Sequence, residues 1–246
     1  MQLLRPVADC SSRVAGRPAS VVVSPGTPKL HARPASFGAG ISHIQGEAGS
    51  IGCFVTKPGD DAWHILSACH VLALSGDATI GDQIVEPAKP SAQSAPLAIL
   101  TDFEPLKDDG TVNSFDAAIA RVLSKADVTV EFPLIDIEPV PMASASFQSV
   151  RKFGAGTGET LGVVTKVRSR VTLDLGAHAY LFENVIQVAG AGGPFSTGGD
   201  SGALVVDAQS NKPIGLIIGG DGAHSFVSPI RPILQRFGVQ LVGKAA

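Results

Sequence analysis

The sequence lacks both an excess of positive charge and a long hydrophobic segment. Its 246 residues include 19 Lys and Arg against 22 Asp and Glu, a net charge of −3 at pH 7. We therefore expect neither a nucleic-acid nor a membrane partner. No stretch approaches the roughly 18 apolar residues of a membrane-spanning helix. Because Met1–Arg13 also lacks the apolar core of a secretory signal, we expect a cytoplasmic protein.

Cysteine is also scarce, since only Cys10, Cys53 and Cys69 occur. An odd number of thiols cannot all pair within one chain, and their spacing matches no zinc motif. The six histidines are too scattered along the chain to indicate a metal site. We therefore expect reduced thiols in a protein that requires neither metal nor cofactor.

Turn-forming residues, by contrast, are abundant. The 28 glycines and 17 prolines argue against a helical bundle and favour many short strands. Apolar residues make up 44% of the chain and charged residues 17%, which is typical of a folded protein with a substantial core. The length is suited to one large domain or two small ones.

The order of patterns along the chain predicts two β-rich halves. Residues 1–47, which contain only one β-prone run (Ser20–Val23), are interpreted as an extended arm that lays a strand on the main body. Residues 48–130 and 131–246 each contain a series of short apolar or alternating runs. We therefore expect an all-β protein of two antiparallel six-stranded β-barrels, one in each half.

Two further segments have a predicted local structure. Pro229–Phe237 carries apolar residues at helical spacing and is followed by Gly238, so we expect a short C-terminal helix there. Gly154–Glu159 is rich in glycine, but it lacks the lysine and the following helix of a phosphate-binding loop. We interpret it as the turn of a hairpin.

The strongest chemical signal is the glycine-rich segment Thr197–Val206, which places Ser201 in a turn directly before an apolar strand. Glycines allow a tight turn in which backbone N–H groups face the space in front of the hydroxyl. An acyl-transfer enzyme needs such an arrangement of nucleophile and oxyanion hole. The predicted oxyanion donors are the N–H groups of Gly199 and Ser201.

A serine hydroxyl needs a base, and the base needs an orienting carboxylate. His70 is the favoured base, because it follows a predicted buried strand and has small neighbours that leave room for a reacting group. Asp116 is a lone acid among apolar residues, where a buried carboxylate requires a partner. Asp102 is the alternative orienting residue.

The order His70, Asp116, Ser201 and the sequences around these residues resemble the chymotrypsin/trypsin-like serine proteases. The nearest likeness is to the narrow-leaf-type trypsin-like proteases of plants and their bacterial relatives. It covers about residues 47–240. The motifs that carry it are Ser67–His70, Phe115–Ala120, Gly198–Gly202, Gly49–Cys53, Lys152–Val164, Phe195–Ser201 and Pro213–Leu216.

The resemblance implies a role for each site residue. Ser201 is the implied nucleophile, His70 the general base and then acid, and Asp116 the residue that holds the imidazole tautomer. Ile218, Gly219 and Gly220 would pair with an extended substrate. Phe195 or Ser196 would lie near the base of the side-chain pocket, and His224 is a further candidate for its lining. None of these residues is acidic, so a preference for Lys or Arg is not indicated.

The resemblance also raises a question about Asp200. In secreted relatives the residue before the serine pairs with a new N-terminal amine after cleavage. Without such processing, Asp200 must find another partner, or the oxyanion loop is regulated. The disulfide that relatives have beside the catalytic histidine is not expected here, because Cys69 precedes His70.

We therefore expect a serine endopeptidase that acts on a protein or peptide substrate. One alternative is a catalytically silent module with the same fold that binds peptides. The other is a latent protease regulated by residues 1–47 or by self-association, so a homo-oligomer remains an open alternative.

Overall fold

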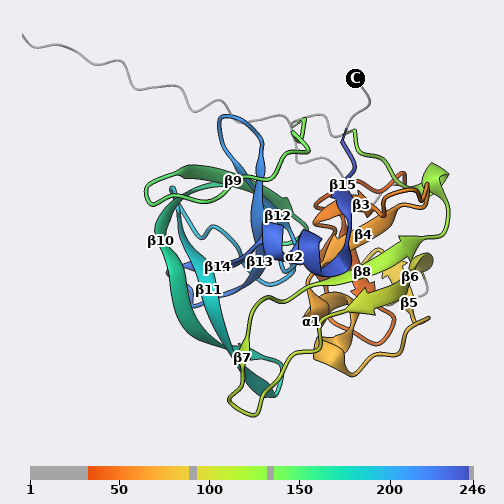
Figure 1. Ribbon diagram of the computed structural model, residues 1–246, viewed down its shortest axis with the longest axis horizontal. Helices are drawn as coiled ribbons and strands as arrows, with labels where there is room; N and C mark the ends of the chain where they lie inside the picture. Colours follow the sequence, from red (N-terminus) through yellow and green to blue (C-terminus); the bar gives the residue numbers. More distant parts are fainter. Residues whose placement is uncertain (1–32, 89–92, 132–135, 244–246) are drawn as a thin grey trace, which may run out of the picture.

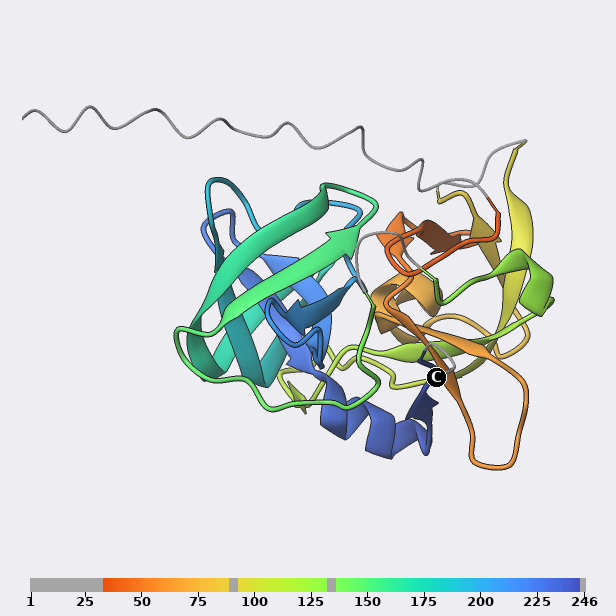
Figure 2. The same cartoon turned by 90° about the horizontal axis from the view of Figure 1, so that it is seen from above.

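The computed structural model describes residues 33–88, 93–131 and 136–243. Two β-sheet units lie side by side, and the C-terminal helix α2 (Ile230–Phe237) lies along both of them (Figures 1 and 2). No helix in the described ranges is long and apolar enough to cross a membrane.

The first unit is an antiparallel sheet in the strand order β15-β3-β4-β8-β6-β5-β1-β2. Six of its strands come from one continuous part of the chain: β1 (Gly40–His43), β3 (Cys53–Thr56), β4 (His64–Ser67), β5 (Gln83–Glu86), β6 (Ala95–Phe103) and β8 (Ala118–Val122). Two-residue strands extend both edges: β2 (Gly49–Ser50) and β15 (Gln240–Leu241). Short helical turns connect them: α1 (Cys69–Leu72), η1 (Leu74–Gly76) and η2 (Lys125–Asp127).

The second unit follows the order β10-β9-β12-β13-β14-β11-β7, and an additional pairing between β10 and β11 closes it. Its six main strands are β9 (Ser149–Gly154), β10 (Gly158–Leu175), β11 (His178–Gly190), β12 (Leu204–Asp207), β13 (Pro213–Gly220) and β14 (Ser225–Pro229). The seventh strand, β7 (Val112–Asn113), comes from the first half of the chain and pairs in parallel with β11. Figure 1 shows β7 beside the far end of the long β10–β11 hairpin.

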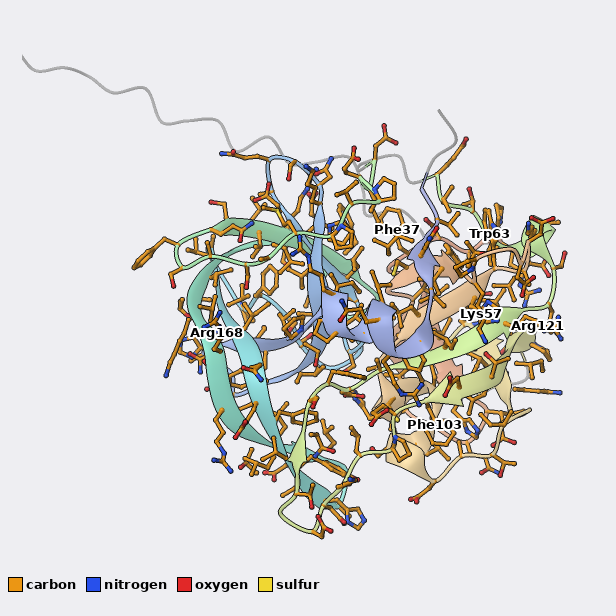
Figure 3. The ribbon with its side chains drawn as sticks, in the orientation of Figure 1. Phe37, Lys57, Trp63, Phe103, Arg121 and Arg168 are labelled. Atoms are coloured by element: carbon orange, nitrogen blue, oxygen red, sulfur yellow. The ribbon has the colours of Figure 1, made fainter. Side chains whose placement is uncertain are left out.

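This architecture confirms the predicted all-β double barrel, with six main strands in each unit. The predicted boundaries, however, are wrong at both ends. Phe37 is buried in the first core and β1 belongs to the first sheet, so the part of the predicted arm after residue 33 is barrel rather than arm (Figure 3). Strand β15 returns to pair with β3, so the chain after α2 belongs to the first barrel. The predicted strand Ser20–Val23 lies outside the described residues.

Helix α2 confirms the predicted C-terminal helix and ties the two units together. Its buried residues Ile230, Ile233 and Phe237 join the core of the first barrel, although the helix directly follows β14 of the second. Gly238 ends the helix with φ 61°, a left-handed conformation in which a residue without Cβ is favoured. The Gly154–Glu159 segment forms the predicted turn between β9 and β10.

The described cysteines are both buried, free thiols. Cys53 lies in β3, and Cys69 opens α1 directly before His70. Burial raises the pKa of Cys53 to about 12 and also raises the pKa of Cys69, because a thiolate is poorly solvated in an apolar core. Neither thiol takes part in a disulfide.

Replacing Phe237 by Ala should lower the free energy of unfolding by about 3–5 kcal/mol, because it leaves a cavity under α2 in the first core. Gln235→Ala, at an exposed position of the same helix, should change it by no more than about 0.5 kcal/mol. Denaturant unfolding measures both. Equal effects of the two variants would contradict the assigned packing of α2.

Cys53 and Cys69 should not react with an aromatic disulfide reagent at pH 8 while the protein is folded, because both are buried and protonated. In a Cys10→Ser variant, guanidinium chloride should expose both thiols. The absorbance of the released aromatic thiol measures this. Rapid reaction of either thiol in the folded protein, or fewer than two reactive thiols after unfolding, would contradict the assignment of both cysteines as buried and free.

Candidate active site

His70 and Asp116 are brought together by the pairing of β4 with β8. His70 lies in α1 just after β4, and Asp116 lies just before β8. The ring Nδ1 of His70 hydrogen-bonds to Asp116 Oδ2, and the backbone N–H of His70 donates to Oδ1 at 3.1 Å. A carboxylate that accepts from Nδ1–H leaves Nε2 as the free acceptor nitrogen of a neutral imidazole. The pair has the orientation that a general base requires.

The rest of the structure favours Asp116 over Asp102 as the orienting carboxylate. Asp116 is fully buried, and its backbone N–H donates to Ser228 Oγ at 3.3 Å across the barrel interface. The Asp102 carboxylate instead contacts the guanidinium of Arg236 at 3.3 Å on the surface. The alternative assignment of Asp102 is therefore wrong.

The loop that carries Ser201 packs directly against the segment that leads to His70. At Gly202, which has φ 84°, an added Cβ would lie 1.9 Å from Ser67 Oγ and 3.0 Å from Ala68 N. Only glycine permits this approach of the two backbones. No hydrogen bond joins Ser201 Oγ to His70 in the described part of the chain. The close approach of Gly202 to Ser67 and Ala68 brings the Ser201 loop against the segment that leads to His70.

The backbone of this loop turns its carbonyls away from the predicted oxyanion donors. An added Cβ on Gly156 would lie 2.5 Å from the Gly198 carbonyl oxygen, and the Asp200 carbonyl accepts from Ala203 N at 2.9 Å. In a trans peptide the N–H points opposite to the C=O. The N–H groups of Gly199 and Ser201 therefore point away from these contacts. Within the described residues, neither of these two N–H groups has a hydrogen-bond acceptor. An oxyanion hole requires such N–H groups, which can donate to the substrate oxygen.

The carboxylate of Asp200 is buried and has several hydrogen-bond and ion-pair partners. The sequence left open which residue pairs with Asp200, and the structure answers this question. Lys152 Nζ lies 3.1 Å from Asp200 Oδ2, and both side chains are fully buried. The N–H groups of Gly156, Thr157 and Thr197 donate to the carboxylate at 3.0, 3.1 and 2.9 Å, and the Thr157 hydroxyl donates at 2.8 Å. The buried cation that pairs with Asp200 is therefore a lysine of the same chain.

The role of Lys152 was not predicted from the sequence. A lysine at a fully buried position of β9, followed by a glycine-rich turn, is the signal that indicates an internal ion pair. Burial lowers the pKa of Lys152, and the nearby Asp200 carboxylate opposes this shift. The turn needs its glycine, because a Cβ on Gly154 would lie 2.3 Å from Asp200 Oδ1.

A cavity of about 350 Å³ opens beside Ser201 and contains three of the five predicted substrate-binding residues. These are Ser196, Gly219 and Gly220. The other two have buried side chains: Phe195 packs in the core of the second barrel, and Ile218 packs against the β10–β11 hairpin. The complete lining is Pro194, Ser196, Thr197, Gly198, Ser201, Ile217, Gly219, Gly220 and Gly222.

Hydroxyl groups rather than charges mark one wall of this cavity. Ser196 Oγ hydrogen-bonds to Ser225 Oγ at 2.6 Å, and Ser225 is buried beneath it. His224 is not among the lining residues, and its ring lies 3.7 Å from Asp221. No acidic side chain lines the cavity, and no metal-ligating cluster occurs among the described residues.

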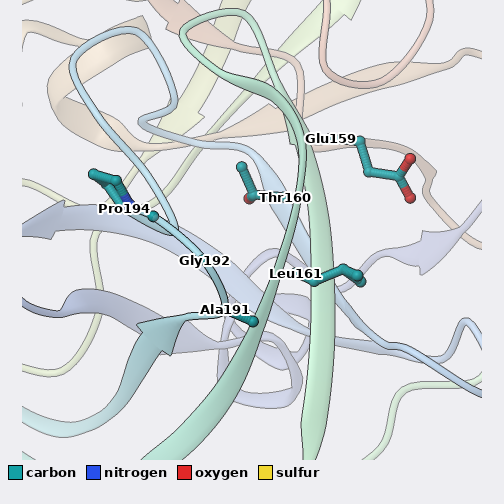
Figure 4. A pocket seen from close by; sticks show the side chains of 7 residues that line it. Glu159, Thr160, Leu161, Ala191, Gly192 and Pro194 are labelled. Atoms are coloured by element: carbon teal, nitrogen blue, oxygen red, sulfur yellow. The ribbon is translucent and has the colours of Figure 1, made fainter. Parts of the chain in front are cut away.

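A second cavity of about 340 Å³ is lined in part by the segment Ala191–Pro194. Figure 4 shows Thr160 on the side of strand β10 that faces this segment, whereas the Leu161 side chain points away from it. Pro194 lines both cavities. Thr160 Oγ1 donates to the Phe195 carbonyl at 2.7 Å. This hydrogen bond holds the backbone at Phe195 against β10.

Comparisons with known proteins agree with this architecture. No family model and no curated protein matches the sequence. Among solved structures, protease A of Thermobifida fusca has 20% identity and a TM-score of 0.60, over 85% of this chain and 100% of that one. Cellulomonas bogoriensis chymotrypsin has 18% identity and a TM-score of 0.58, over 85% and 98%. A glutamic-acid-specific serine protease has 19% identity and a TM-score of 0.59, over 85% and 100%. The chain has the chymotrypsin-like double-barrel fold of these bacterial and related proteases.

Proposed function

We propose that the protein is a serine endopeptidase in which Ser201, His70 and Asp116 act together. The observation that carries the proposal is the buried Asp116 carboxylate, bonded to Nδ1 of His70 next to the loop of Ser201. The shared fold with solved proteases supports it, but a fold alone does not determine a function.

In the proposed reaction, Ser201 Oγ attacks the carbonyl carbon of a peptide bond while His70 Nε2 takes the hydroxyl proton. The carbonyl oxygen becomes an oxyanion that accepts hydrogen bonds from the N–H groups of Gly199 and Ser201. His70 then gives its proton to the leaving amine as the C–N bond breaks, which leaves an ester on Ser201. Water attacks this ester by the same sequence, and the acid product leaves.

The C-terminal end of β13, which extends beyond the pairing of β13 with β12, is the proposed edge for the substrate backbone. Gly219 and Gly220 pair with β14 on one side and line the cavity beside Ser201. An extended peptide can add to such an edge as a further strand. Because hydroxyls and no carboxylates line the cavity, we propose an uncharged residue before the cleaved bond rather than Lys or Arg.

A fluorophosphonate probe should label the purified wild-type protein on Ser201, because phosphonylation requires the activated hydroxyl. Ser201→Ala and His70→Ala should not be labelled, and mass spectrometry of the digested protein should locate the adduct. Asp116→Asn should lower the turnover rate by about 10⁴-fold. Asp102→Asn, the matched surface variant, should retain nearly the wild-type rate.

Absence of labelling in the folded wild-type protein would contradict the proposal. The probe would then be applied to a variant without residues 1–32. Labelling that appears only in the shortened variant would indicate a latent protease, and continued absence would indicate a silent peptide-binding module.

Replacing Lys152 by Met should abolish labelling although the three proposed catalytic residues remain. The buried Asp200 carboxylate would lose its cation, at a cost of about 3–5 kcal/mol in the free energy of unfolding, and its loop would lose support. Arg151→Met, at the neighbouring partly exposed cation, should keep the labelling rate. Labelling and denaturant unfolding measure these effects.

The same ion pair predicts competence without N-terminal cleavage. The intact mass of the labelled wild-type protein should therefore correspond to the uncut chain. Labelling confined to a shortened chain would show that Lys152 does not replace a terminal amine.

A further inference from the structure

We infer that Ser50 is a positioning residue for the oxyanion hole, an inference that rests on the proposed function. Ser50 ends β2, the edge strand of the first barrel, and is fully buried. The predicted oxyanion donors Gly199 and Ser201 belong to the second barrel. Ser50 is therefore a contact between the barrels at the place where the proposed chemistry occurs.

The hydroxyl of Ser50 uses both its donor and its acceptor capacity on the second barrel. Ser50 Oγ donates to the Gly199 carbonyl at 2.7 Å and accepts from the N–H of Ala155 at 2.9 Å. It thus links the oxyanion loop to the glycine-rich turn that wraps the Asp200 carboxylate. Alanine at this position would leave a partly buried carbonyl and a partly buried N–H without these partners.

The backbone of Ser50 holds the same loop two peptides further on. Its N–H donates to the Ser201 carbonyl at 2.8 Å, and its own carbonyl accepts from Ser67 Oγ at 2.7 Å. A Cβ on the neighbouring Gly49 would lie 2.9 Å from the Ser201 carbonyl oxygen, so the two chains are in close contact. Ser50 therefore holds the carbonyls of Gly199 and Ser201, the two residues that flank Asp200.

Gly199 needs such an external restraint. It has φ 95° and no side chain, so its own backbone permits many orientations of its N–H. Asp200 is fixed from the second barrel by Lys152, but that ion pair does not contact the Gly199 peptide groups. The Ser50 hydroxyl holds the C=O of the Gly199–Asp200 peptide, whose N–H donates to the Thr197 carbonyl at 3.1 Å. This peptide directly follows the one that carries the Gly199 N–H. We expect loss of the hydroxyl to let the Gly199 N–H turn away from the developing oxyanion.

This role differs from that of an ordinary buried hydrogen bond. A merely structural hydroxyl lowers the free energy of unfolding but leaves the turnover of each folded molecule unchanged. A positioning hydroxyl lowers the rate of the step in which the oxyanion forms. It leaves substrate affinity and the pH profile set by His70 unchanged.

The test compares Ser50→Ala with Ser50→Thr, which keeps the hydroxyl, and with Thr101→Val. The last variant removes a hydroxyl that donates to the Ile119 carbonyl within the first barrel, away from the site. The turnover of p-nitrophenyl acetate would be measured for each variant, per active site titrated with the fluorophosphonate. Hydrogen–deuterium exchange would be measured for the peptide that covers residues 197–203.

Ser50→Ala should lower kcat by on the order of 10- to 100-fold, somewhat less than removal of an oxyanion donor, with KM and the pH profile unchanged. Exchange in residues 197–203 should become faster. Ser50→Thr should recover most of the rate, and Thr101→Val should lower only the melting temperature.

Unchanged kcat and unchanged exchange in Ser50→Ala would overturn the inference, as would equal kcat losses in Ser50→Ala and Thr101→Val. An inactive wild-type protein would overturn the proposed function instead. The exchange measurement would then still decide whether Ser50 holds the loop.

Discussion

The candidate site depends on the neutralisation of one buried carboxylate. Asp200 has no access to water, and an isolated charge in such a place is very costly. Lys152, three backbone N–H groups and a threonine hydroxyl surround it. Because Asp200 directly precedes Ser201, these contacts fix the turn in which the nucleophile lies. The glycine-rich turn after β9 and the glycine-rich loop before β12 are thus two halves of one structure.

The second constraint is that the site is shared between two barrels. His70 and Asp116 come from the first barrel and Ser201 from the second, so the proposed chemistry requires a fixed contact between them. Glycine at position 202 allows the backbones to touch. Helix α2 crosses from the second barrel into the first core, and β7 crosses in the opposite direction. These connections hold the units together over several separate places rather than through one linker.

Much of the fold could be predicted from the sequence, because strand periodicity and turn residues are local. The hairpin turn at Gly154–Glu159 and the helix after Pro229 were predicted for that reason. The membership of Phe37 in the first barrel was not predicted, because its segment is short and has no regular alternation of apolar and polar residues. The burial of the Phe195 side chain in the second core was also not predicted. Phe195 and Ser196 are neighbours in the same motif, and only one of the two side chains can face the cavity.

By itself, the sequence determined the all-β double barrel, the glycine-rich loop of Ser201, and the identity of His70 and Asp116 as partners. These residues stand in distinctive local patterns. Only the tertiary structure decided between Asp116 and Asp102, gave Asp200 its cation, and placed Ser50 on the Gly199 carbonyl. The last two contacts join residues 48 and 149 positions apart. Such pairs leave no trace in local periodicity, because their geometry exists only when the barrels have formed and packed together.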